Sequence, residues 1–99
     1  MSRYGLSEET IVKIIDTIKR CDRVEGILLY GSRAQGRYRE FSDIDLTLTG
    51  DSLTRDDLIR IISEIDDLLL PYEIDISLYK DIDYVPLLRE IQRTAIPLA

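Results

Sequence analysis

Two short segments in which acidic residues alternate with isoleucine and leucine constrain the fold of this chain most strongly. They are residues 42–49 and residues 73–78. Because successive side chains of a β-strand point to opposite faces, each segment predicts a strand with one apolar and one polar face. Asp43 and Asp45 share the polar face of the first strand, and Asp75 lies on the polar face of the second. We therefore expect a sheet that is covered by helices on one face and open on the other.

The remaining elements follow from apolar periodicity and from capping residues. Three segments show helical spacing, residues 8–20, 55–70 and 83–93. Ser7 can cap the first helix, and Thr54 with Asp57 three residues later matches a capping box at the start of the second. An apolar, partly β-branched run at residues 24–30 predicts a further strand. The order of elements indicates an α+β (α/β) fold, a mixed sheet of three to four strands with helices on one face.

Length and composition narrow the kind of protein. The 99 residues suffice for one core, so we expect a single domain over residues 1–99. A net charge of −6 argues against general nucleic-acid binding, and no apolar run approaches the ~20 residues that span a bilayer, so no membrane partner is expected. With one cysteine, Cys21, no internal disulfide can form, and this favours a cytoplasmic location.

The aspartates indicate a metal site. Two carboxylates on one face of a strand repel each other by about 4 kcal/mol at ~4 Å when the effective dielectric constant is near 20. A divalent cation between them removes this repulsion, and carboxylate oxygens suit Mg²⁺ or Mn²⁺, whereas zinc usually takes Cys or His. If the two strands are neighbours, Asp75 joins Asp43 and Asp45, and three ligands can hold two metal ions ~3.5–4 Å apart. Such a group serves phosphoryl or nucleotidyl transfer. The alternative is that these aspartates are only solvated strand residues.

A Gly31-Ser32 pair follows the strand expected at residues 24–30 and predicts a phosphate-binding turn. Gly31 lets the backbone approach a ligand closely, and Ser32 adds a hydroxyl and an amide donor. Mg²⁺ fills its remaining positions with water and substrate phosphates, so a nucleotide triphosphate is the expected co-ligand. Arg33, in the arginine-rich loop that follows, is a further candidate for a phosphate contact. Alternatively, the pair is only a turn and the loop only a solvated basic segment.

Taken together, these residues resemble the minimal nucleotidyltransferase (MNT) domains of the DNA polymerase beta-like superfamily. The motif consists of Gly31, Ser32, an interval of ten residues, Asp43 and Asp45, with Asp75 on a later strand. The resemblance covers nearly the whole chain and implies the polymerase beta-like nucleotidyltransferase fold. It also implies that the three aspartates bind the metals and that Gly31 and Ser32 hold the triphosphate. Gln35 departs from the family pattern, which often has a basic residue there.

Stand-alone domains of this family commonly pair with a helical HEPN protein and act as antitoxins that transfer AMP from ATP onto it. The resemblance therefore implies an enzyme, a protein adenylyltransferase, that uses ATP and two Mg²⁺ ions, with Mn²⁺ as a substitute. We expect a HEPN toxin as partner, with Arg37 and Arg39 meeting its acidic or phosphorylated groups. Two alternative functions stay open, neutralisation of the toxin by binding alone and transfer to a small molecule. Among partners, a second copy of the chain in a homodimer also stays open.

Overall fold

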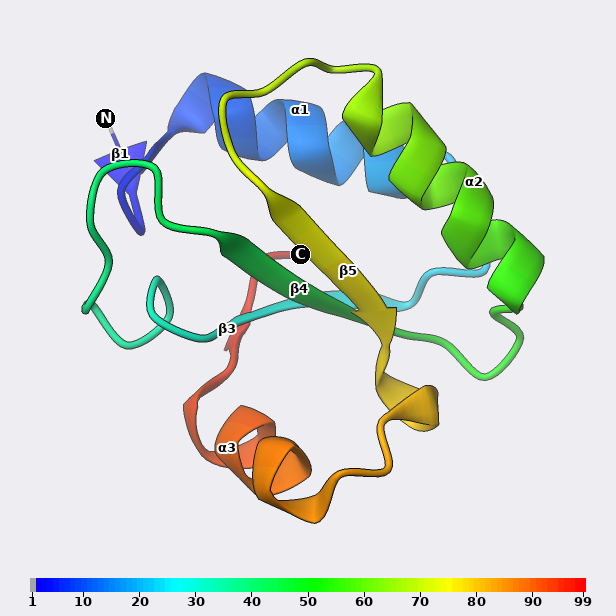
Figure 1. The fold of residues 1–99 in the computed structure, drawn as a ribbon. Helices are drawn as coiled ribbons and strands as arrows, with labels where there is room; N and C mark the ends of the chain where they lie inside the picture. Colours follow the sequence, from blue (N-terminus) through cyan, green and yellow to red (C-terminus); the bar gives the residue numbers. More distant parts are fainter. Residues whose placement is uncertain (1) are drawn as a thin grey trace.

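A four-stranded mixed sheet forms the centre of the molecule in the computed structural model, which describes residues 2–99 (Figure 1). Its strands, in the spatial order β5-β4-β3-β6, are Ile74–Leu78, Ile44–Thr49, Gly26–Tyr30 and Ile96–Pro97. Strand β3 runs antiparallel to β4 and β6, whereas β4 and β5 are parallel. The sheet confirms the predicted α+β class. Strand β6, a two-residue strand, lies outside the expected elements.

Three helices connect or flank these strands. They are α1 (Glu8–Ile18), α2 (Arg55–Asp66) and α3 (Val85–Thr94). A 3-10 turn, η1 (Tyr79–Asp81), follows β5, and a short hairpin of β1 (Ser2–Arg3) and β2 (Leu6–Ser7) precedes α1. Helix α2 ends earlier than its apolar pattern predicts, because the chain leaves the helix through Leu69, which has a left-handed φ of 54°.

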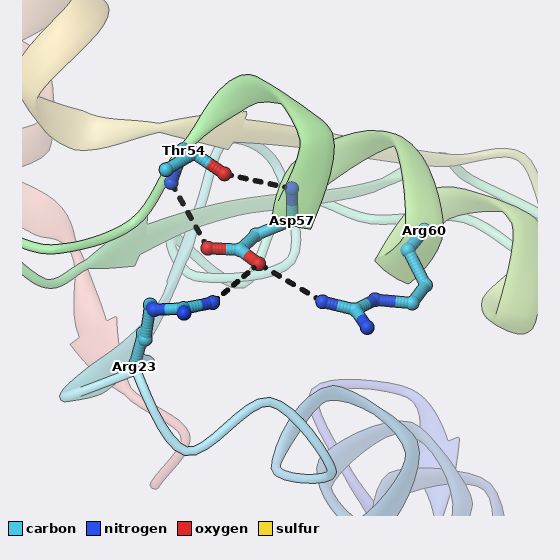
Figure 2. A network of polar contacts seen from close by, with 4 residues as sticks. All are labelled: Arg23, Thr54, Asp57 and Arg60. Carbon is cyan, nitrogen blue, oxygen red and sulfur yellow. Dashed lines mark hydrogen bonds and ion pairs between the residues drawn. The ribbon is translucent and has the colours of Figure 1, made fainter.

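Local side-chain hydrogen bonds explain where α1 and α2 begin. The Ser7 hydroxyl accepts a hydrogen bond from the Thr10 amide at 3.1 Å. Thr54 and Asp57 form the predicted capping box, in which each side chain accepts a hydrogen bond from the other residue's amide at 3.1 Å. Figure 2 shows that the Asp57 carboxylate also accepts hydrogen bonds from Arg23 and Arg60. Both predicted helix starts are therefore confirmed.

The core lies between one face of the sheet and the pair α1 and α2, which Figure 1 shows together above the strands. Their isoleucine stripes meet the apolar faces of the strands in one cluster, which includes Ile11, Ile14, Ile18, Ile27, Leu29, Ile44, Leu46, Leu48, Ile61, Ile65, Ile76 and Leu78. Burying such side chains contributes about 1.5–3 kcal/mol each. Cys21, a free cysteine, joins this cluster just after α1.

The second face of the sheet differs from the expectation of an open polar surface. Figure 1 shows α3 on the opposite side of the sheet from α1 and α2. On this face Thr47 is fully buried, and its hydroxyl accepts a hydrogen bond from the Ser77 hydroxyl at 3.1 Å. Polar side chains that pair with each other can be covered without a large desolvation cost. At one end of this face, Asp75 stays exposed and Asp45 partly exposed.

None of the helices within residues 2–99 has both the length and the apolar character needed to cross a bilayer.

Candidate functional site

The three predicted aspartates come together at one end of the sheet. Asp45 on β4 and Asp75 on β5 are direct neighbours in the parallel register, and Asp43 stands two residues before Asp45. All three line a groove of about 460 Å³. Asp66, Tyr72 and Glu73 line the same groove, which is therefore strongly acidic. Alternation along the two strands predicted the common face of Asp45 and Asp75, and the register makes these two residues neighbours, whereas Asp43 lies just before β4.

At this end of the sheet, acidic groups repel one another when no cation is bound. Partial burial raises the pKa of Asp45, and the negative charges of Asp75, Asp43 and Glu90 raise it further. Tyr30, the register partner of Asp45 on β3, has its pKa raised by burial and then by Asp45 and Asp75. Crowded acidic groups of this kind favour a bound cation, which would remove the repulsion.

The chemistry of the donors fits a hard divalent cation, because the groove offers carboxylate oxygens and the chain has no His. Among residues 2–99, however, no three acidic, His or Cys side chains are arranged as a ready metal-binding group. Asp43 and Asp75 are exposed, so their carboxylates are free to turn towards Asp45. The aspartates thus supply suitable ligands, and metal binding by them stays a prediction.

The Gly31-Ser32 turn lies directly beside the carboxylates. Gly31 follows the end of β3, adopts a left-handed φ of 78°, and faces the Asp45 carboxylate so closely that a Cβ there would collide with it. The turn is closed by a hydrogen bond from the Arg37 amide to the Ser32 carbonyl at 2.9 Å. A glycine is therefore required where this turn meets the strand that carries Asp45.

Arg33 differs from its predicted role as a nucleotide ligand. Its side chain is only 2% exposed, and its guanidinium donates to backbone carbonyls, to Ser42 at 2.7 and 3.2 Å and to Tyr4 at 2.8 Å. A guanidinium held in this way by two protein segments is not presented to a phosphate. These contacts argue against the predicted phosphate contact of Arg33.

Glu90 and Gln35 form a connection that the sequence did not reveal. The Gln35 amide donates to the Glu90 carboxylate at 3.1 Å, and Arg37 donates to the Gln35 carbonyl oxygen at 2.6 Å. Glu90 belongs to α3, so this contact links the loop after the Gly31-Ser32 turn to the helix on the polar face. Only the fold brings Glu90 near Asp45, and no local sequence signal could have found it.

Comparison with a family model now identifies the class of the protein. Residues 12–99 match the model described as polymerase beta, nucleotidyltransferase. The chain belongs to this nucleotidyltransferase family, which confirms the resemblance inferred from the motif. No curated protein matches the chain at a significant level.

Solved structures show the same fold. A toxin-antitoxin structure with AMP-PNP matches 90% of this chain and 72% of its own, with a TM-score of 0.72 and 22% identity. The tri-AMPylated Shewanella oneidensis HEPN toxin in complex with MNT antitoxin matches with a TM-score of 0.69 and 18% identity, over 93% of this chain and 71% of that one. The toxin-antitoxin MntA-HepT matches with a TM-score of 0.68 and 18% identity, over 94% of this chain and 72% of that one.

Proposed function

We propose that this chain is a metal-dependent nucleotidyltransferase that transfers AMP from ATP to a hydroxyl of a helical HEPN-type toxin and thereby acts as its antitoxin. The observation that carries the proposal is the meeting of Asp43, Asp45 and Asp75 beside the Gly31-Ser32 turn. Two matched structures support the choice of substrate and partner, since one is with AMP-PNP and another contains a tri-AMPylated HEPN toxin bound to an MNT antitoxin.

Each site residue has a role in this proposal. Asp43, Asp45 and Asp75 would hold two Mg²⁺ ions, or Mn²⁺ in their place, which when bound neutralise phosphate charge and favour ionisation of the acceptor. The Ser32 hydroxyl and the amides near Gly31 would hold the β- and γ-phosphates and so orient the leaving group.

The transfer is an in-line substitution at the α-phosphorus. The acceptor oxygen forms a bond to that phosphorus while the bond from phosphorus to the oxygen bridging the β-phosphate breaks, and pyrophosphate leaves. Asp75 takes the proton of the acceptor hydroxyl, because it lies on the edge strand β5 and its exposed carboxylate faces the groove.

A partner would close the site. Asp43 and Asp75 are exposed, and water in an open groove competes with the acceptor. Arg37 and Arg39 lie exposed on the loop between the phosphate turn and Asp43, where they can meet acidic groups of the docked partner. Charge reversal of both arginines should weaken the complex on size-exclusion chromatography or slow the transfer.

The central experiment measures transfer of label from ATP to the co-purified partner in the presence of Mg²⁺. Replacing both metal-binding aspartates, Asp43→Asn with Asp45→Asn, should lower the rate by at least about 10³-fold, because several kcal/mol of charge stabilisation are lost. Asp16→Asn, an exposed aspartate on α1, is the matched control and should transfer at the normal rate. Transfer that survives the double change would disprove the assignment.

The binding-only alternative is separated by a cell experiment. If the Asp43→Asn, Asp45→Asn chain still protects cells from the toxin fully at equal expression, neutralisation occurs by occlusion and not by AMP transfer. Efficient transfer to a free small molecule by the isolated chain would instead show that no protein partner is needed.

A further inference from the structure

The buried guanidinium of Arg33 contacts segments next to each part of the proposed site. Arg33 itself follows Ser32 of the phosphate turn, and its Nε and Nη2 both donate to the carbonyl of Ser42, which directly precedes Asp43. The guanidinium carbon of Arg33 also lies over the ring of Tyr72, 5.1 Å from the ring centroid. Tyr72 lines the acidic groove and stands just before the strand that carries Asp75.

A second set of contacts fixes the guanidinium from the amino-terminal side. Nη1 donates to the Tyr4 carbonyl at 2.8 Å, and the ring of Tyr38 covers the group at 5.5 Å. Gly5 makes room for this arrangement, since a Cβ there would lie 2.9 Å from Nη1 and would clash with Tyr38. The turn of the β1-β2 hairpin is therefore shaped to receive the arginine.

Only an arginine can make these contacts at once. Its planar fork reaches two carbonyls in different directions and stacks on aromatic faces, whereas a lysine ammonium is a compact charge on a flexible stem. A cation buried to this extent must have its donors satisfied, so loss of these partners would be costly. The arrangement has the properties of a fixed spacer and not of a mobile phosphate ligand.

We infer that Arg33 is a positioning residue that sets the separation of the Gly31-Ser32 turn, Asp43 and Asp75. The inference rests on the proposed nucleotidyl transfer for its catalytic consequence, while its structural part stands on the contacts alone. Because a displacement of about 1 Å can reduce a rate on the order of 10²-fold, replacing Arg33 should lower kcat while the KM for ATP changes little. A phosphate ligand would show the opposite pattern, a raised KM for ATP.

The test uses Arg33→Lys and Arg33→Met, with Arg93→Met, an exposed arginine of α3, as the control. Hydrogen exchange followed by mass spectrometry should show faster exchange in residues 32–43 of both Arg33 variants, with α2 unchanged. Transfer to the partner should show a kcat lowered on the order of 10²-fold at an unchanged KM for ATP. The lysine variant should not restore the rate, because it keeps the charge and loses the fork.

The outcomes separate this inference from the proposed function. Unchanged exchange in residues 32–43, or a raised KM for ATP at normal kcat, would overturn the positioning role. If the wild-type chain itself transfers nothing, the proposed function fails, and hydrogen exchange alone still decides whether Arg33 fixes the loop. If both Arg33 variants fail to fold, Gly5→Ala provides the test. Its methyl group would collide with the Tyr38 ring that covers the guanidinium and with Nη1 itself, so it should produce the same local exchange. Unchanged exchange would count against the inference.

Discussion

Asp57 and Asp45 show two opposite treatments of an aspartate in one small protein. Asp57 is 2% exposed and is surrounded by donors, the Thr54 amide at 3.1 Å and Arg23 and Arg60 at 3.0 Å each (Figure 2). The hydrogen bond from the Thr54 backbone is the main reason that the pKa of Asp57 is lowered. Asp45 is partly buried among Asp75, Asp43 and Glu90, and its pKa is raised.

The difference separates a carboxylate that stabilises the fold from one that, in the proposed function, binds a metal ion. Hydrogen bonds from the protein favour the ionised form of Asp57, so its charge contributes to folding. At Asp45 the ionised form is disfavoured by burial and by like charges, so the isolated protein bears a cost there. This cost is the reason to expect that a cation fits the groove.

The largest stability effect is expected at Asp57. Asp57→Asn should lower the Tm by about 10 °C, because it weakens the capping box and leaves Arg23 and Arg60 without their shared partner. Asp56 directly precedes Asp57 on α2 and is exposed, so Asp56→Asn should change the Tm by far less. Transfer of label below the melting range should stay normal in both variants. Equal melting of the two would show that the network contributes nothing.

Mg²⁺ and nucleotide should stabilise the protein only through the region around Asp45. Mg²⁺ with a non-hydrolysable ATP analogue, at about four times its Kd, stabilises by about 1 kcal/mol and should raise the Tm by about 4–8 °C. The Asp43→Asn, Asp45→Asn chain should lose this shift, while Asp57→Asn should keep it. A shift of equal size in the double variant would place the ligand elsewhere.

A single neutralisation at Asp45 should stabilise the metal-free protein. In EDTA, Asp45→Asn should raise the Tm by about 2–4 °C, because it removes a partly buried charge from a like-charged group. Asp16→Asn on the surface of α1 serves as the control and should leave the Tm nearly unchanged. A lower Tm for Asp45→Asn would mean that this carboxylate stabilises the fold as Asp57 does.

The smallest effect is the pH dependence, and here the two aspartates should differ in sign. The lowered pKa of Asp57 means that its stabilisation is present above the unfolded value near 3.9 and is lost as the pH falls through the folded pKa. The raised pKa of Asp45 means that stability falls as the pH rises from about 3.9 through the folded pKa.

Melting from pH ~3 to 8 in EDTA measures both contributions as differences from the wild type. The amount by which the Tm of Asp45→Asn exceeds that of the wild type should decrease towards pH ~4, by about one or two degrees overall. The deficit of Asp57→Asn should persist to pH ~4 and shrink only below it. Differences of the same sign for both variants would remove the contrast.

Local sequence patterns predicted both regions in part. Alternation placed Asp43, Asp45 and Asp75 on one face, and the three-residue spacing of Thr54 and Asp57 predicted the capping box, since both depend on neighbours in the chain. The structure adds the register that joins Asp45 to Asp75.

Contacts between distant segments could not be predicted in the same way. Arg23 reaches Asp57 from another part of the chain, and Arg33 turns inwards to Tyr4 and Ser42 although its loop is polar. The position of α3 over the polar face has the same origin. Periodicity indicates that a helix has an apolar side, but it does not specify which surface that side packs against.

The strand order also implies a sequence of local opening within the sheet. Strand β6 pairs Leu28 and Leu29 with residues from the far end of the chain, so its closure costs much loop entropy for only a two-residue pairing. We expect β6 to separate first in slow native-state fluctuations, which would loosen β3 and the turn at Gly31. Strand β4 stays paired with both β3 and β5, so Asp45 on this strand should keep its place longest. In the proposed nucleotidyl transfer, the Gly31-Ser32 turn would then move relative to Asp45, whereas Asp75 lies on the other edge strand, β5.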